Sequence, residues 1–128
     1  MGNHIDIRTT IRGPVPRIPF GQMAQDVLGA RYELSLVICG DRLAQRINKE
    51  YRKKDYYPNV LSFELGEAEG EIFLNVRKAA REARQLGTTL SKRIALLYVH
   101  GLFHLRGMDH SDAMEHAEQN VLKKYGLQ

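Results

Sequence analysis

The chain has 128 residues, of which 43% are hydrophobic, so it can bury one core and is expected to form a single domain over residues 1–128. Its net charge of +4 and its pI of about 9.3 make a nucleic acid a reasonable partner. Neither an apolar signal segment nor a run of about eighteen apolar residues occurs, so we expect a cytoplasmic protein without a membrane anchor.

The N-terminal half alternates between strand and helix patterns. Runs rich in β-forming residues indicate strands, and apolar residues three and four positions apart indicate amphipathic helices. In order, the expected elements are an edge strand over His4–Arg8, a helix over Pro19–Gly29, a strand over Tyr32–Cys39 and a helix over Arg42–Arg52. Asp41 is expected to cap the second helix, with Leu43, Ile47 and Tyr51 facing the core. Cys39, the only cysteine, is expected to be a buried thiol.

The C-terminal half contains the most hydrophobic predicted helix. From Leu90 onward, apolar residues cover almost the whole circumference of a helix, which indicates that it is buried. The other expected elements are strands over Val60–Leu65 and Glu71–Val76, a helix over Arg77–Gly87 and a last helix that is capped by Ser111 or Asp112 and reaches about Tyr125. The sequence therefore predicts an α+β fold with a small mixed sheet of about four strands, flanking helices and a central buried helix.

Three of the five histidines lie in the run from His100 to His110. On a helix, His100 and His104 lie about 40° apart and point to one side. Gly107 can end that helix and fold the chain back, which brings His110 toward the same point. Three imidazoles without a fourth protein ligand predict a catalytic metal site, most simply for zinc, although nickel, copper and iron bind the same donors. His116 is expected at the surface.

The same histidine spacing occurs in metzincin proteases, in which a glutamate after the first histidine is the general base. Gly101 occupies that position here and has no side chain that could accept a proton. A protease of that type is therefore disfavoured, but two alternatives to a nuclease stay open. One is a metal-dependent hydrolase of peptides or small amides, and the other is a non-catalytic RNA- or ribosome-binding module with structural zinc.

The string HGxxHxxGxDH, from His100 to His110, resembles the YbeY family of bacterial metal-dependent endoribonucleases. Three upstream blocks extend the resemblance over about residues 37–125. They are Asn48–Arg52 as N-x-x-YR, Asn59–Phe63 as [DN]VLSF and Gly70–Ile72 as G-[DE]-I. Pro58 and Glu64 depart from the pattern, because family members usually carry threonine and proline at these positions.

The resemblance implies a single-strand-specific endoribonuclease that acts in maturation of the 3′ end of small-subunit rRNA and in ribosome quality control. Its expected partners are single-stranded RNA and rRNA, with the small ribosomal subunit as a further candidate. His100, His104 and His110 are the expected catalytic metal ligands. Arg52 aligns with an arginine characteristic of the family and is expected to bind the scissile phosphate, because guanidinium groups match phosphate oxygens.

Two polar residues inside these motifs are given structural roles. Ser62 is expected to be a turn residue that bonds to the backbone, and Asp109 is expected to be a hydrogen-bond partner of a histidine. The sequence identifies neither the general base nor the oligomeric state.

Overall fold

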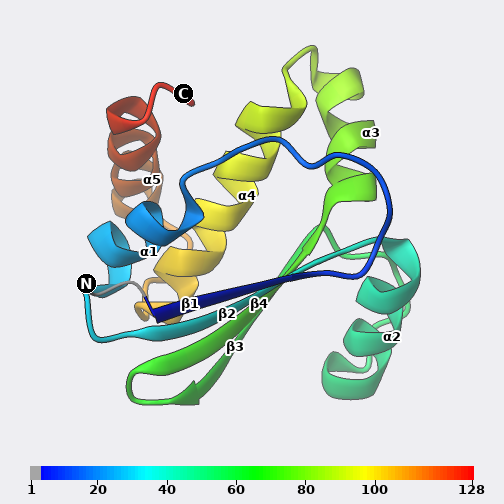
Figure 1. Ribbon diagram of the computed structural model, residues 1–128, viewed down its shortest axis with the longest axis horizontal. Coiled ribbons are helices and arrows are strands. Elements are labelled where there is room, and N and C mark those ends of the chain that lie inside the picture. Colours follow the sequence, from blue (N-terminus) through cyan, green and yellow to red (C-terminus); the bar gives the residue numbers. More distant parts are fainter. Residues whose placement is uncertain (1–3) are drawn as a thin grey trace.

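The computed structural model describes residues 4–128, which form a four-stranded mixed sheet and five helices (Figure 1). In chain order the elements are β1 (His4–Thr9), α1 (Phe20–Leu28), β2 (Glu33–Cys39), α2 (Asp41–Arg52), β3 (Val60–Gly66), β4 (Glu69–Asn75), α3 (Val76–Leu86), α4 (Leu90–Leu105) and α5 (Asp112–Lys124). The predicted α+β fold class is confirmed, and the predicted elements end within two residues of the observed ones. None of the helices in this part of the chain has the length and hydrophobicity needed to cross a membrane.

The sheet has the strand order β1-β2-β4-β3. β2 pairs in parallel with both β1 and β4, whereas β3 and β4 form an antiparallel hairpin. A parallel pair needs a long crossover connection, and α1 supplies it between β1 and β2. The hairpin places β3 at one edge of the sheet, and its register shifts between Glu64 and Gly66.

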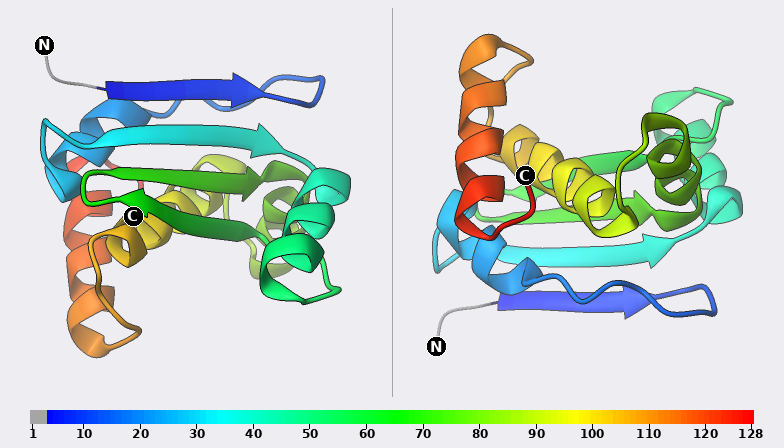
Figure 2. Two further views of the ribbon diagram at one scale, coloured as in Figure 1. Left: turned by 90° about the horizontal axis from the view of Figure 1, so that it is seen from below. Right: turned by 90° about the horizontal axis from the view of Figure 1, so that it is seen from above.

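Helix α4 lies over one face of the sheet, with α1, α3 and α5 on the same side (Figures 1 and 2). Its residues Ile94, Leu102 and Tyr98 are fully buried, so the predicted central buried helix is confirmed. The Tyr98 hydroxyl donates a hydrogen bond of 2.7 Å to the carbonyl of Phe20, which satisfies a polar group in the core. This packing gives α4 a fixed position relative to the sheet.

Helix α2 lies on the opposite face, at the end of the sheet (Figures 1 and 2). It covers a small cluster of buried side chains that includes Val37, Cys39 and Ala44. Burial raises the pKa of the Cys39 thiol to about 12, as expected for a buried cysteine that stays protonated.

Two predictions for α2 are wrong. Asp41 is the first helical residue, and the N-cap is Gly40. Tyr51 is 64% exposed, because the buried face of α2 is formed by Ala44 and Asn48 at the end of the sheet. The ring of Tyr51 instead packs edge-on against Phe63, with ring centroids 5.9 Å apart.

Candidate metal centre

The C-terminal half of α4 carries His100 and His104. Their Nε2 atoms lie 3.0 Å apart, and their rings are nearly perpendicular. Gly107 has φ 97°, a conformation that glycine adopts without steric cost, and its amide donates to the carbonyl of His104. The helix ends at Leu105, two residues before Gly107, as the sequence predicted.

The chain folds back after Gly107 and brings His110 to the first two histidines. The His110 ring centroid lies 4.7 Å from that of His100 and 4.9 Å from that of His104. Ser111 fixes the following turn, because its hydroxyl accepts a hydrogen bond from the amide of Met114 at the start of α5.

The donor set fits one metal ion. Ligand atoms of His100, His104 and His110 all lie within 4.8 Å of one another. Two nitrogens bound tetrahedrally to zinc at about 2.0 Å lie roughly 3.3 Å apart, close to the separation of the first two Nε2 atoms. His110 is exposed, so this side of the site is accessible to solvent.

Glu118 of α5 is a member of this site that the sequence did not predict. Its Oε2 lies 2.6 Å from Nδ1 of His100, and its side chain is only 7% exposed. When Nδ1 of His100 carries the proton, it donates a hydrogen bond to Glu118. Nε2 then keeps a free lone pair that faces His104. Glu118 thus takes the hydrogen-bonding role that was expected of Asp109, which is exposed.

A sequence signal for Glu118 does exist. Met114, Glu118 and Leu122 follow one another at intervals of four, and all three are buried. A carboxyl group on the apolar face of an amphipathic helix needs a polar partner, and His100 is that partner.

The electrostatics of the cluster favour neutral imidazole at His104. Desolvation lowers the pKa of His104, and repulsion from His100 and His110 lowers it further. Neutral imidazole is the form that binds a metal ion, so protons compete less effectively for this ligand position.

The three histidines line a cleft of about 730 Å³ between α4 and β3. Ser62 of β3 donates a hydrogen bond of 3.2 Å to the carbonyl of Gly101, so its predicted backbone contact is confirmed, although it lies in a strand and not in a turn. A Cβ at Gly101 would lie 2.9 Å from Ser62 Oγ and 3.2 Å from Ile72 Cδ1. Glycine at this position therefore lets β3 approach the metal-bearing helix closely.

Arg52, the last residue of α2, lines the same cleft as the three histidines. Lys53 ends the helix in the left-handed conformation, with φ 58°. The buried Asn48 side chain then donates to the carbonyl of Tyr56, which holds the loop between α2 and β3. The sequence predicted Arg52 as a site residue, and the structure brings it to the histidine cleft.

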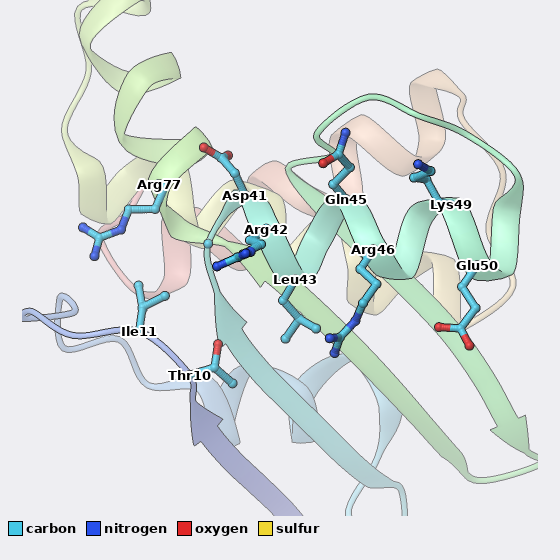
Figure 3. Close-up of a pocket in the computed structure, with 11 residues that line it drawn as sticks. Thr10, Ile11, Asp41, Arg42, Leu43, Gln45, Arg46, Lys49, Glu50 and Arg77 are labelled. Carbon is cyan, nitrogen blue, oxygen red and sulfur yellow. The ribbon is translucent and has the colours of Figure 1, made fainter.

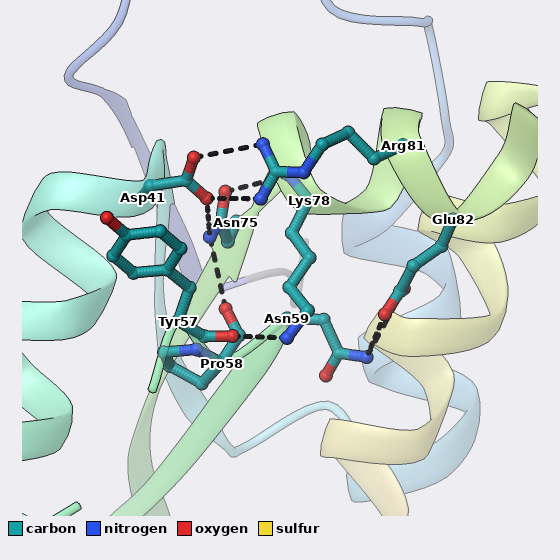
Figure 4. A network of polar contacts seen from close by, with 8 residues as sticks. All are labelled: Asp41, Tyr57, Pro58, Asn59, Asn75, Lys78, Arg81 and Glu82. Atoms are coloured by element: carbon teal, nitrogen blue, oxygen red, sulfur yellow. Dashed lines mark hydrogen bonds and ion pairs between the residues drawn. The ribbon is translucent and has the colours of Figure 1, made fainter. Parts of the chain in front are cut away.

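A polar network fixes the residues just before β3 (Figure 4), of which Asn59 lines the cleft. Asn59 donates to both oxygens of Glu82, at 3.1 and 3.3 Å, and Glu82 accepts a bond of 3.0 Å from Arg93. Asn75 donates to the carbonyl of Pro58 and to the carboxylate of Asp41 (Figure 4). These contacts attach the loop before β3 to α3 and α4.

The family model described as Endoribonuclease YbeY matches residues 19–126 of the chain. The chain belongs to the YbeY endoribonuclease family. The family resemblance predicted from the histidine motif and its upstream blocks is thereby confirmed.

Three curated proteins named endoribonuclease YbeY illustrate the similarity. The protein of Bordetella petrii is 43% identical over 99 residues, which cover 73% of this chain and 64% of that protein. The Bacillus licheniformis protein is 37% identical, over 74% of this chain and 73% of the relative. The Aquifex aeolicus protein is 36% identical, over 84% of this chain and 77% of the relative. The chain thus spans slightly less than two thirds of the Bordetella YbeY protein.

The fold also matches a solution structure of a protein from Thermotoga maritima. The TM-score is 0.68, and the match covers 94% of this chain and 91% of the other. The two sequences are 19% identical, so this similarity concerns the fold alone.

Proposed function

We propose that this YbeY family member is a metal-dependent endoribonuclease that cleaves single-stranded RNA. The observation that carries the proposal is the placement of Arg52 in one cleft with His100, His104 and His110. The names of the relatives, endoribonuclease YbeY, support RNA cleavage as the reaction. The positive net charge favours a polyanionic substrate.

In this proposal His100, His104 and His110 hold one zinc ion, and Glu118 orients His100 toward it. When bound, the ion supplies Lewis acidity toward a phosphodiester oxygen. Three protein ligands leave a coordination position free, and the exposure of His110 supports an accessible site. A zinc site that only stabilises a fold has four protein ligands as a rule, so this donor set favours catalysis.

Arg52 binds the scissile phosphate and stabilises the negative charge that develops on it. Its guanidinium group has parallel N–H donors that match two phosphate oxygens. The neighbouring Tyr51 and Tyr56 side chains are 64% and 52% exposed and offer rings on which unpaired bases stack. Tyr51 also packs against Phe63, which lines the cleft, so an exposed ring beside the cleft favours single-stranded RNA, whose bases are free to stack.

The finer assignment follows the family resemblance. We propose small-subunit rRNA as the substrate, with maturation of its 3′ end and ribosome quality control as the processes, and the cytoplasm as the location. The small ribosomal subunit is the proposed binding partner.

Cleavage of a labelled single-stranded RNA by the zinc-loaded protein tests the proposal. We expect products that disappear after chelation and in the His104→Ala variant, whereas His116→Ala, which removes an exposed histidine of α5, retains activity. Equal cleavage by wild type and His104→Ala would refute the assignment. A parallel panel of peptides and small amides tests the alternative hydrolase, which predicts activity there and none on RNA.

A further inference from the structure

A second, larger groove of about 1070 Å³ lies along α2 (Figure 3). It shares no lining residue with the histidine cleft. Its walls come from α2, the residues after β1 and the start of α3. Arg42 and Arg46 of α2 point to the side of Thr10 and Ile11 (Figure 3). Arg77 of α3 also lines the groove, but its guanidinium group points away from α2 and donates a hydrogen bond of 3.1 Å to the carbonyl of Arg12. Two guanidinium groups of α2 therefore face one concave surface.

The charge of this groove is not neutralised within the protein. Glu50 also lines the groove, but over residues 4–128 no carboxylate lies within 4.0 Å of the guanidinium group of Arg42 or Arg46. Asp41 also lines the groove, but its carboxylate points away from Arg42 and is bound by Arg81 at 2.8 and 2.9 Å (Figure 3). Arg42 and Arg46 are therefore available to an external anion.

The backbone and the apolar residues of the groove fit the same ligand. Gly40 caps α2 without a side-chain hydrogen bond, so the positive end of the helix dipole adds to the charge of the groove. Leu43 and Ile11 add apolar surface between the arginines. Phosphates joined by riboses and bases present this combination of negative charge and apolar surface.

Helix α2 joins the groove to the histidine cleft. Arg42 and Arg46 line the groove from the first turns of α2, and Arg52 lines the cleft from its last turn. Arg52 lies ten positions after Arg42 on the helix, a rise of about 15 Å, which a few nucleotides of extended strand can span.

We propose that this groove is a second binding site for the phosphate backbone of single-stranded RNA, which holds the strand at a distance from the bond that is cut. The inference rests on the proposed function for the identity of the ligand. It assigns Arg42 and Arg46 to binding of the substrate and not to the chemical step. It also predicts that long RNA strands bind more tightly than short ones.

Fluorescence anisotropy with labelled single-stranded RNA of about 4 and about 16 nucleotides tests the proposal, in the presence of a chelator that prevents cleavage. We expect Arg42→Gln/Arg46→Gln to weaken binding of the long strand about tenfold, with little effect on the short one. The slope of log affinity against log salt should fall by about 1.4, because about 0.7 is lost for each phosphate contact to a single strand. Arg42→Lys/Arg46→Lys should retain most of the binding.

The matched control is Arg31→Gln/Arg84→Gln, which removes the same charge from two exposed positions outside the groove. The proposal is overturned if Arg42→Gln/Arg46→Gln, the groove variant, binds the long strand as tightly as the wild type. It is also overturned if the control variant loses as much affinity for the long strand as the groove variant. A groove that binds a protein partner instead of RNA would leave RNA binding by the groove variant at the wild-type level. Equal melting temperatures of the variants exclude unfolding as the cause of a loss.

Cleavage is measured separately, so the two proposals fail in different ways. A wild-type protein that binds long RNA through the groove but never cuts it overturns the endoribonuclease assignment alone. A protein that cuts RNA and binds it equally well without Arg42 and Arg46 overturns the second site alone.

Discussion

Nδ1 of His100 lies 2.6 Å from Oε2 of Glu118, a side chain that is 7% exposed in the contact between α4 and α5. This hydrogen bond selects the tautomer of His100 in which Nε2 is free, and it fixes the orientation of the ring. The carboxyl group lies behind the metal ligand, on the side away from His104, whose Nε2 faces the other nitrogen of His100.

Replacement of Glu118 should therefore weaken metal binding without removing a ligand. We expect Glu118→Ala to raise the dissociation constant for zinc about 10- to 100-fold. Glu118→Gln, which keeps an acceptor oxygen, should lose less zinc affinity than Glu118→Ala. Competition with a chromophoric chelator measures the constant, and Glu115→Gln, at an exposed position of the same helix, is the control. Unchanged affinity in both Glu118 variants would show that the carboxyl group does not position His100.

The close contact at Gly101 gives a second prediction. Gly101→Ala places a Cβ 2.9 Å from Ser62 Oγ, in a core that cannot absorb the clash easily. Alanine improves helix propensity by about 1 kcal/mol, but overpacking costs about 1–3 kcal/mol, so we expect a lower free energy of unfolding. Urea denaturation measures it.

Ser62→Ala removes the atom that the new methyl group meets. The double variant Gly101→Ala/Ser62→Ala should therefore recover part of the stability lost in Gly101→Ala, with a coupling energy above about 0.5 kcal/mol. Additive effects of the two substitutions would argue against a clash between these side chains.

The parts of the fold that depend on local periodicity could be predicted from the sequence. His100 and His104 are close because they are separated by one helical turn, and Gly107 ends the helix because of its own backbone freedom. The apolar circumference of α4 likewise indicated its burial. Each of these features follows from residues near one another in the chain.

Contacts between distant segments were not predictable in this way. Asp41 has a residue type that is common at N-caps, but Arg81, forty residues away, binds its carboxylate. Glu118 has no local partner and acquires one only when α5 packs against α4. The family motif implied that Arg52 belongs to the site. Residue spacing alone could not predict that Arg52 lines the same cleft as the histidines.

The Asp41–Arg81 pair predicts how stability depends on pH. Hydrogen bonds from Arg81 are the largest cause of the lowered pKa of the Asp41 carboxyl group. Because the folded-state pKa lies below the unfolded one, the stabilisation is complete above the ordinary carboxyl range and is lost as pH falls through the folded value.

Asp41→Asn should lower the free energy of unfolding by about 1 kcal/mol near neutral pH, a small value because both side chains are partly exposed. The difference from wild type should narrow as pH falls below the ordinary carboxyl range. Urea midpoints at about pH 7 and about pH 3.5 measure this change. Asp55→Asn, at a more exposed ion pair with Lys49, is the control and should show a smaller effect. A constant difference at both pH values would contradict the assigned cause.

Arg52 provides the sharpest test of the proposed chemistry, because it shares the cleft with the histidines but is not a metal ligand. Arg52→Ala should lower kcat for RNA cleavage about 100- to 1000-fold, as expected when a group that stabilises transition-state charge is lost. The affinity for zinc should stay unchanged. Arg52→Lys should restore only part of kcat, since an ammonium group cannot bind two phosphate oxygens in parallel. Arg84→Ala, at an exposed position of α3, is the control for net charge. A variant without Arg52 that keeps wild-type kcat would exclude this arginine from the chemical step.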